Sequence, residues 1–337
     1  MAIGDLLHQT PVTTPDPYTG CPVTRLTPPD HTSHHMYFYN RMVTSDSSRL
    51  LYCAEINGRR NLYLMELATG DAVQLTEGDA LDDYGAMISA DDKSVYYQQD
   101  RKVWKLDLAT LQRTCLYAAP DGWDCGNWGM SDDNRYLVMT ETRRDTLPDL
   151  TGKKGWEFFP LTCAAKPLCH IVYLDTQTGE HHIVVEDRCW FGHAQLRPGD
   201  PDTILFCHEG PYDMIDARLW LIQSDGSRYR CARPQPKDVI ITHEFWMPTG
   251  DRLAYVYRKA DDGSTETIRM MRPETLEEEL FMPCLPYAHF ICDRQRRWFV
   301  GDCQGQETPI HLQTGEGRGH HEADILRYMR REFRLSG

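Results

Sequence analysis

The sequence predicts an all-β fold of the β-propeller type, and two patterns carry that prediction. A short polar turn that leads into an apolar strand recurs along the chain, beginning at residues 45, 89, 131, 197, 248 and 292. In most units a second strand follows about ten residues later and ends in its own turn. Repeats of roughly 40 to 50 residues with antiparallel strands are typical of propeller blades. A two-sheet sandwich is the alternative, but about six similar units favour radial stacking.

The ends of the repeat array define the expected domains. Residues 22–27 resemble residues 72–76, the outer strand of the first full unit, and propellers usually close by pairing such an N-terminal strand with the last blade. Residues 143–167 form an insertion that lengthens one unit. We therefore expect a propeller domain over residues 1–314. Residues 315–337 form a divergent tail, expected to be helical in part because apolar residues recur there at partly helical spacing.

No further strand pair is expected after Gly301, so the propeller is predicted to be cut short.

Composition excludes several kinds of partner. Apolar residues make up 41% of the chain and charged residues 26%, which predicts a packed globular protein. A net charge of −14 argues against nucleic acid, although a small anion can still bind a local basic pocket. No apolar run approaches the roughly 18 residues that span a bilayer, and no secretory signal pattern is present. The twelve cysteines include no Cys-x-x-Cys, so we expect free thiols in a reducing cytoplasm.

Candidate chemistry concentrates between residues 207 and 246. The strings CHEGP at 207–211, DAR at 216–218 and THEFW at 242–246 place two His-Glu pairs and one arginine beside short apolar runs. Histidine is the side chain best suited to move a proton near neutral pH, and arginine is the usual partner of a carboxylate. No Gly-rich phosphate loop, nucleophile elbow or paired-cysteine zinc motif supports another enzyme class.

These strings, with RLTPPD at 25–30 and QLTEG at 74–78, together resemble the oligogalacturonate lyase family from about residue 10 to about residue 310. The resemblance implies a seven-bladed cytoplasmic propeller that cleaves short galacturonides, especially unsaturated digalacturonate, by β-elimination with Mn²⁺ or a similar divalent cation. It implies that His243 is the general base, Arg218 the catalytic arginine and His289 one metal ligand. The family's other ligands lie in a Gln-x-x-His-x-His motif that this sequence lacks, so most of them are not found.

Each candidate residue also has a structural interpretation. His243 could be a hydrogen-bonded histidine at a strand end, Arg218 could pair with Asp216, and His289 could pack against neighbouring aromatic rings. Four further residues are candidates for lining the site or supporting it: His208, Glu209, His193 and His34. His34 precedes the aromatic residues 37–39, which we expect to form an inner strand.

The chemistry of β-elimination fits these residue types. The reaction removes the proton at C5, α to the uronate carboxylate, and expels the sugar at C4. A divalent cation on the carboxylate stabilises the developing charge, an imidazole takes the proton, and an arginine orients the carboxylate.

Two other hypotheses remain open: a non-catalytic propeller that binds sugar acids, and a truncated, inactive relative of the lyase. An alternative ligand set near His320 and His321 would separate an active enzyme from both. No nucleic acid or membrane is expected as a partner, and the sequence leaves the oligomeric state open.

Overall fold

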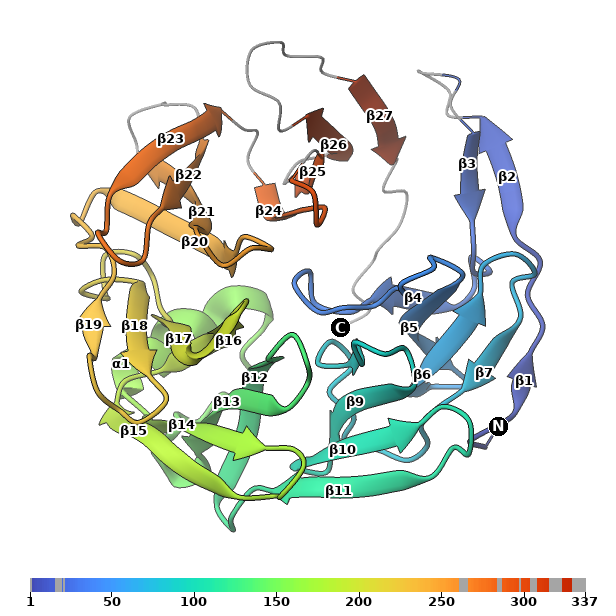
Figure 1. Ribbon diagram of the computed structural model, residues 1–337, viewed down its shortest axis with the longest axis horizontal. Coiled ribbons are helices and arrows are strands. Elements are labelled where there is room, and N and C mark those ends of the chain that lie inside the picture. Colours follow the sequence, from blue (N-terminus) through green and yellow to red (C-terminus); the bar gives the residue numbers. More distant parts are fainter. Residues whose placement is uncertain are drawn as a thin grey trace. The chain divides into compact units, whose positions relative to one another are not determined.

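The computed structural model describes residues 2–15, 20, 22–260, 266–283, 287–296, 298–303, 308–314 and 323–328. The chain falls into two compact units: Met1–Pro11 with Leu26–Lys237, and Val12–Arg25 with Asp238–Gly337. Nearly every element is a β-strand, and successive strands of a sheet are mostly neighbours in the chain (Figure 1). The all-β prediction is confirmed. No helix in the described part is long and apolar enough to cross a membrane.

The first unit contains four antiparallel sheets. The first has the order β1-β7-β6-β5-β4 and the next three follow chain order or its reverse. The first sheet comprises β1 (Leu6–Leu7), β4 (Thr32–His35), β5 (Arg49–Ile56), β6 (Arg59–Glu66) and β7 (Ala72–Gln74). The second comprises β8 (Met87–Ile88), β9 (Ser94–Gln99), β10 (Lys102–Asp107) and β11 (Arg113–Ala118). The third comprises β12 (Trp123–Met130), β13 (Tyr136–Arg143), β14 (Leu168–Asp175) and β15 (His181–Arg188). The fourth comprises β16 (Phe191–Arg197), β17 (Asp200–His208), β18 (Leu219–Gln223) and β19 (Arg230–Cys231).

The second unit contains two four-stranded sheets and a hairpin. The first sheet comprises β20 (Val239–Trp246), β21 (Leu253–Lys259), β22 (Thr267–Met271) and β23 (Glu278–Pro283). The second comprises β24 (Tyr287–Cys292), β25 (Trp298–Cys303), β26 (Thr308–Thr314) and β27 (Ala323–Tyr328). The hairpin joins β2 (Val12–Pro15) to β3 (Pro22–Arg25). The strand that we expected to pair with the last blade therefore has β2 as its partner here.

The tail also differs from expectation. We predicted no strand pair after residue 301 and some helix beyond residue 315, but β26 pairs with β27 and completes a four-stranded sheet. Residues 323–328 read ADILRY, and so short a run does not by itself distinguish a helical period from a strand. Antiparallel pairing with β26, which satisfies the backbone groups, decides the outcome.

The repeated turns that revealed the blades share one hydrogen-bonded design. A hydroxyl donates to the carboxylate two residues on, from Thr44 to Asp46 at 2.7 Å, Ser89 to Asp91 at 2.6 Å and Ser131 to Asp133 at 2.6 Å. The residue after each carboxylate has a left-handed backbone, with φ of 60°, 60° and 59° at Ser47, Asp92 and Asn134. Small polar residues tolerate this conformation best, which explains the composition of the repeat.

These turns also join neighbouring sheets of the first unit. The Asp92 carboxylate accepts a hydrogen bond from the Ser45 backbone N–H at 3.0 Å, and the Asn134 side-chain oxygen accepts one from the Ala90 N–H. The same kind of position therefore both closes a turn and links that turn to the preceding sheet.

The core of the first unit consists of layers between successive sheets. Val95 packs with residues of the first sheet, whereas its neighbour Tyr96 packs with residues of the third. Likewise, Leu137 packs with residues of the second sheet and Val138 with residues of the fourth. Because side chains alternate across a strand, the middle strands are buried on both faces and read as continuous apolar runs. Each such side chain contributes about 1.5–3 kcal/mol through burial.

The insertion at residues 143–167 forms a helical cap beside the fourth sheet. It contains two 3₁₀ turns, η1 (Arg144–Thr146) and η2 (Gly155–Glu157), and the helix α1 (Phe158–Ala165). The ring centroid of Trp190 lies 5.3 Å from that of Phe159. A Cβ atom at Gly210 would lie 2.4 Å from the Cys163 Sγ atom, and Gly210 has a φ of +148°. Only glycine fits there, so α1 fixes the path of the chain after β17.

The Asp46 turn generates a stability prediction. Hydrogen bonds from the Thr44 hydroxyl and from Ser48 lower the Asp46 pKa from 3.8 to about 2. A lowered pKa contributes stability above pH 3.8 that is lost as the pH falls toward 2. We expect Asp46→Ala to be less stable than wild type at pH 6 and the two unfolding curves to converge near pH 2. Urea denaturation across this range tests it, and a difference independent of pH would contradict the role of the charge.

Candidate functional site

Two of the candidate histidines lie at matching irregularities in their strands. The β16–β17 register shifts between Gly192 and Gln195, and the β20–β21 register shifts between Thr242 and Phe245. His193 and His243 lie inside these bulges with φ of 51° and 56°, whereas the other positive-φ residues of the described strands and turns lie outside strands. A left-handed non-glycine residue within a strand is strained, and such bulges re-aim side chains at functional sites.

Arg218 is held in place by both its backbone and its side chain. It precedes β18, and its carbonyl accepts a hydrogen bond from the His208 N–H at 3.0 Å. Its own N–H donates to the Gln235 side-chain oxygen at 3.0 Å. The guanidinium Nη1 lies 3.1 Å from the Glu209 Oε2 atom, so the ion pair given by the structure is with Glu209 rather than with Asp216. No sequence pattern indicated Gln235, because it lies 17 residues from Arg218 in a loop.

His193 and Glu209, both candidates for the site, complete a buried cluster with Arg218. The exposed fractions are 8% for His193, 9% for Glu209 and 6% for Arg218. The Arg218 Nη2 atom lies 3.2 Å from His193 Nδ1, and His193 Nε2 lies 3.2 Å from the Tyr37 hydroxyl. The cluster thus holds one cation and one anion beside an imidazole, in a setting where weak dielectric screening strengthens charge–charge interactions.

The segment that carries Tyr37 differs from expectation. We predicted an inner strand at residues 37–39, but β4 ends at His35 and these residues form a turn. The rings of Tyr37 and Tyr39 approach His193 with centroid distances of 5.6 and 6.4 Å. Residues 37 and 39 would share a face in a strand as well, and here a turn brings both aromatic side chains toward one histidine.

His208 is not part of that cluster, although it adjoins Glu209 in sequence. Its ring stacks on Trp220 with a centroid distance of 4.4 Å, and its Nε2 atom lies 3.2 Å from the Tyr229 hydroxyl. Successive residues at a strand end point to opposite faces, so His208 packs among aromatic rings while Glu209 faces Arg218. The structure therefore gives His208 a packing role.

In the second unit, His243 and His289 lie together. Their ring centroids are 5.0 Å apart with an interplanar angle of 61°. Phe245 and Phe290, one or two residues further along the same strands, also meet at 5.0 Å. Packing between β20 and β24, which belong to different sheets, brings two sequence-predicted candidates side by side.

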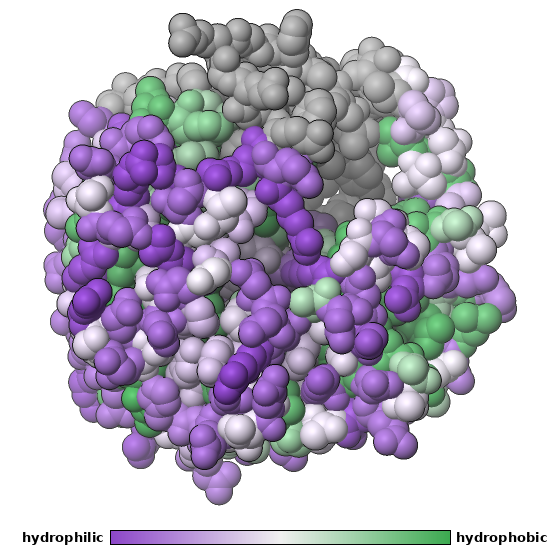
Figure 2. Space-filling view, in the orientation of Figure 1, coloured by the Kyte–Doolittle hydropathy of each residue, from purple (hydrophilic) through white to green (hydrophobic). Residues whose placement is uncertain are grey.

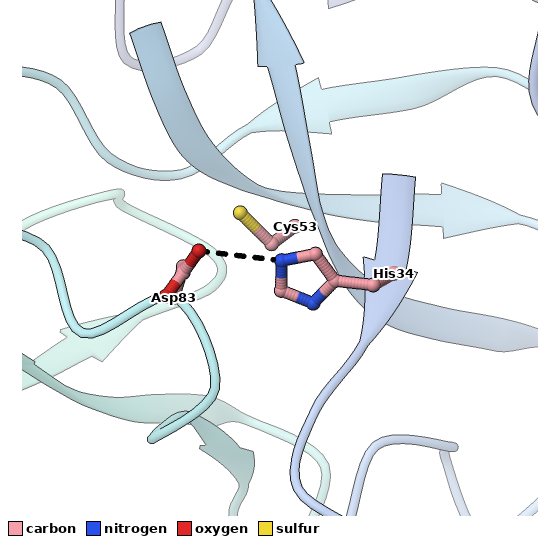
Figure 3. Close-up of side chains that lie close together, drawn as sticks. All are labelled: His34, Cys53 and Asp83. Carbon is pink, nitrogen blue, oxygen red and sulfur yellow. Dashed lines mark ion pairs between the residues drawn. The ribbon is translucent and has the colours of Figure 1, made fainter. Parts of the chain in front are cut away.

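His34 belongs to a different cluster, with Cys53 and Asp83 (Figure 3). His34 Nε2 lies 3.4 Å from Asp83 Oδ2, and the Arg60 Nη1 atom lies 2.7 Å from the same oxygen. Burial, reinforced by the Asp83 charge, raises the pKa of the Cys53 thiol to about 12. A protonated thiol and a carboxylate already paired with arginine are poor metal ligands, so we assign no metal to this group.

The buried position of His208 leads to a testable pH dependence. Burial lowers its pKa from 6.5 to about 4, so between these values the unfolded chain takes up a proton that the folded chain does not. Stability present above pH 6.5 is lost as the pH falls toward 4. The His208→Phe variant keeps an aromatic ring against Trp220 but has no group that titrates. We expect the slope of its unfolding free energy against pH to be smaller than that of the wild type by up to about 1.4 kcal/mol per pH unit. Urea denaturation between pH 4.5 and 7 measures it, and equal slopes in both proteins would contradict it.

Comparisons with known proteins place the chain in a family. The family model described as oligogalacturonate lyase matches residues 1–331. An oligogalacturonide lyase of Pectobacterium atrosepticum is 36% identical over 319 residues, covering 94% of this chain and 81% of the relative. An oligogalacturonate lyase of Dickeya dadantii is 37% identical over 321 residues, with the same coverage.

Solved structures agree with these sequence matches. A structure of oligogalacturonate lyase in complex with manganese superposes with a TM-score of 0.90 at 36% identity, covering 96% of this chain and 86% of that one. The Vibrio parahaemolyticus oligogalacturonate lyase gives a TM-score of 0.88 at 34% identity, covering 95% and 86%. The resemblance found in the sequence is confirmed: the chain has a β-propeller fold and belongs to the oligogalacturonate lyase family.

Proposed function

We propose that this protein is an oligogalacturonate lyase that cleaves short galacturonides, with unsaturated digalacturonate as a preferred substrate. The observation that carries the proposal is the strained backbone of His243 inside β20, where φ is 56°. A sheet does not need this strain, which costs of order 1–3 kcal/mol. The bulge turns the His243 imidazole out of the regular alternation of the strand. In a family of lyases, proton transfer is the best explanation for such a placement.

The reaction is a β-elimination. His243 takes the proton from C5, the electron pair forms the C4=C5 double bond, and the C4–O bond breaks. The departing oxygen becomes the hydroxyl of the released sugar once it is protonated. The imidazole suits this role because it accepts a proton near neutral pH.

Arg218 is proposed to bind a substrate carboxylate. Its planar guanidinium has five N–H donors, of which the contacts with Glu209 and His193 account for three, and it remains charged under all working conditions. Its side chain is paired with Glu209 at 3.1 Å, so the guanidinium is held in one orientation before substrate arrives. Such preorganisation lowers the entropic cost of reaching the reactive geometry.

The manganese found with the related lyase raises the question of a divalent cation here, and His289 is the ligand that the resemblance implies. The rings of His243 and His289 are neighbours, but no group of three His, Cys, Asp or Glu donors found among the described residues includes either one. The described residues supply only part of a ligand set around these two histidines, and we route no step through the metal. His320 and His321, the alternative ligands, lie outside the described residues.

We further propose that the protein acts in the cytoplasm during pectin breakdown. Nine cysteines of the described part are free thiols, several of them buried, which suits a reducing compartment. The partner of the protein is then a small oligogalacturonide rather than a macromolecule.

The role of His243 is tested by its alanine variant. We expect His243→Ala to lower kcat on digalacturonate by about two to four orders of magnitude, the usual contribution of a general base. The unsaturated product is followed by ultraviolet absorbance. His181→Ala, a change at an exposed histidine of β15, is the control and should leave the rate unchanged. An unchanged rate in His243→Ala would remove His243 from the mechanism.

Arg218→Lys tests the proposed carboxylate contact. Lysine keeps the charge but cannot reproduce a planar pair of hydrogen bonds, so kcat/KM should fall about 10- to 100-fold, the worth of one hydrogen bond to a charged group. Arg135→Lys is the matched control, because Arg135 also pairs with a carboxylate, Asp175 at 3.3 Å, in another sheet. Near wild-type kinetics for Arg218→Lys would assign Arg218 a structural role only.

A further inference from the structure

The Glu209 carboxylate receives an unusual set of donors. Its Oε2 atom lies 3.1 Å from Arg218 Nη1, and its Oε1 atom lies 3.5 Å from Arg218 Nη2. The same Oε1 atom lies 3.3 Å from His193 Nε2 and 3.3 Å from the Cys207 Sγ atom. Three side chains from β16, β17 and the start of β18 thus converge on one buried anion.

The geometry also fixes where the proton of His193 lies. Arginine can only donate, so Arg218 Nη2, at 3.2 Å, requires His193 Nδ1 to accept. The ring proton must then reside on Nε2, which is hydrogen-bonded to the Tyr37 hydroxyl at 3.2 Å and also lies 3.3 Å from Glu209 Oε1. Arg218 thus donates to both His193 and Glu209, and His193 Nε2 lies beside the Glu209 carboxylate, so each of the three side chains contacts the other two. Each member fixes the orientation of the other two.

Two glycines leave the space that Glu209 needs. A Cβ atom at Gly192 would lie 2.7 Å from both Cγ and Oε1 of Glu209 and 3.1 Å from Cys207 Sγ. On the other side, Gly210 packs against Cys163 of α1. The two glycines therefore let Glu209 and the residue after it pack closely against their neighbours, where a larger residue at position 192 or 210 would clash.

We propose that Glu209 is a positioning residue of the lyase: through its paired contacts with Arg218 and His193 it sets the plane of the guanidinium that binds the substrate carboxylate. This inference rests on the proposed function. A carboxylate that contacts both terminal nitrogens of a guanidinium fixes its plane, and a misplaced binding group costs rate even when its charge is intact. Glu209 touches no substrate in this proposal and acts only through Arg218.

A double-mutant cycle provides the main test, using Glu209→Gln, Arg218→Lys and the double variant in the full chain. Glutamine keeps the shape of Glu209 but removes its charge. We expect kcat/KM on digalacturonate to fall about 10- to 100-fold in Glu209→Gln, and the double variant to be no worse than Arg218→Lys alone. Wild-type kinetics in Glu209→Gln, or losses that multiply in the double variant, would overturn the proposal.

Two further variants separate positioning from general loss of stability. Gly192→Ala keeps the Glu209 charge but displaces the side chain, so it should reproduce the kinetic loss of Glu209→Gln while the protein remains folded by circular dichroism. Glu141→Gln is the matched control: Glu141 is 0% exposed and lies 2.6 Å from His170 Nε2, in the third sheet. It should change the melting temperature without changing kcat/KM. If Glu141→Gln lowered kcat/KM as much as Glu209→Gln does, loss of any buried carboxylate would explain the result, and the positioning role would be contradicted.

Nitrogen-15 spectra of histidine-labelled protein test these contacts without any assay of activity. The proposal requires His193 to carry its proton on Nε2 in the wild type and to change its nitrogen shifts in Glu209→Gln. A proton on Nδ1 would show that His193 does not accept from Arg218, which would overturn the proposal. If the wild type cleaves no galacturonide, the proposed function fails, and these spectra still decide whether Glu209 orients its partners. If the wild type is active and Glu209→Gln is equally active, only the positioning role fails.

Discussion

The register shift at the histidine of β16 is the constraint on which the best-defined part of the site depends. Because one extra residue lies in the bulge, His193 leaves the regular alternation of the strand and adopts a φ of 51°. That conformation turns its ring toward Arg218 and Tyr37. A regular strand would present residue 193 to one face of the sheet only. A register shift of the same kind occurs at His243 in β20, so a bulge contains a histidine in two of the sheets.

A strained residue needs a scaffold that does not relax around it. In the first unit that scaffold consists of sheets whose middle strands are buried on both faces, as at Leu205 and Phe206 of β17. Close packing on both faces leaves no volume into which the strand could straighten. The helix α1 adds a further support, because its Cys163 packs so closely on Gly210, just beyond Glu209, that a Cβ atom there would clash. Rigidity built from apolar packing thus holds a polar cluster in place.

The sequence predicted the repeats better than it predicted the partners within the site. Turns such as that of Asp46 recur because a left-handed residue and a carboxylate acceptor are local requirements, which a single segment reveals. The β26–β27 pairing was missed because a strand with mixed polar and apolar residues depends on its neighbour. The turn at residues 37–39 was read as a strand because aromatic residues favour strands in general.

The partner of Arg218 shows a different limit of sequence reasoning. Asp216 is two residues away and was the obvious candidate, whereas Glu209 is nine residues away at the end of another strand. Only the antiparallel pairing of β17 with β18 places Glu209 beside Arg218. Motif strings identified both residues as notable, but the register that joins them is a property of the folded sheet.

Burial of the Arg218–Glu209 pair is difficult to explain by stability alone. Their side chains are 7% and 11% exposed, so folding removes most of the water from two charges. The attraction within such a pair often does no more than offset that desolvation, and well-packed apolar residues would stabilise the sheet as well or better. Removing one partner, by contrast, leaves an uncompensated buried charge at a cost of about 3–5 kcal/mol. The pair therefore makes the fold more vulnerable without making it clearly more stable. The arrangement does hold the Arg218 guanidinium in a fixed orientation beside the strained His193. A fixed cation of this kind suits a lyase that acts on carboxylated sugars.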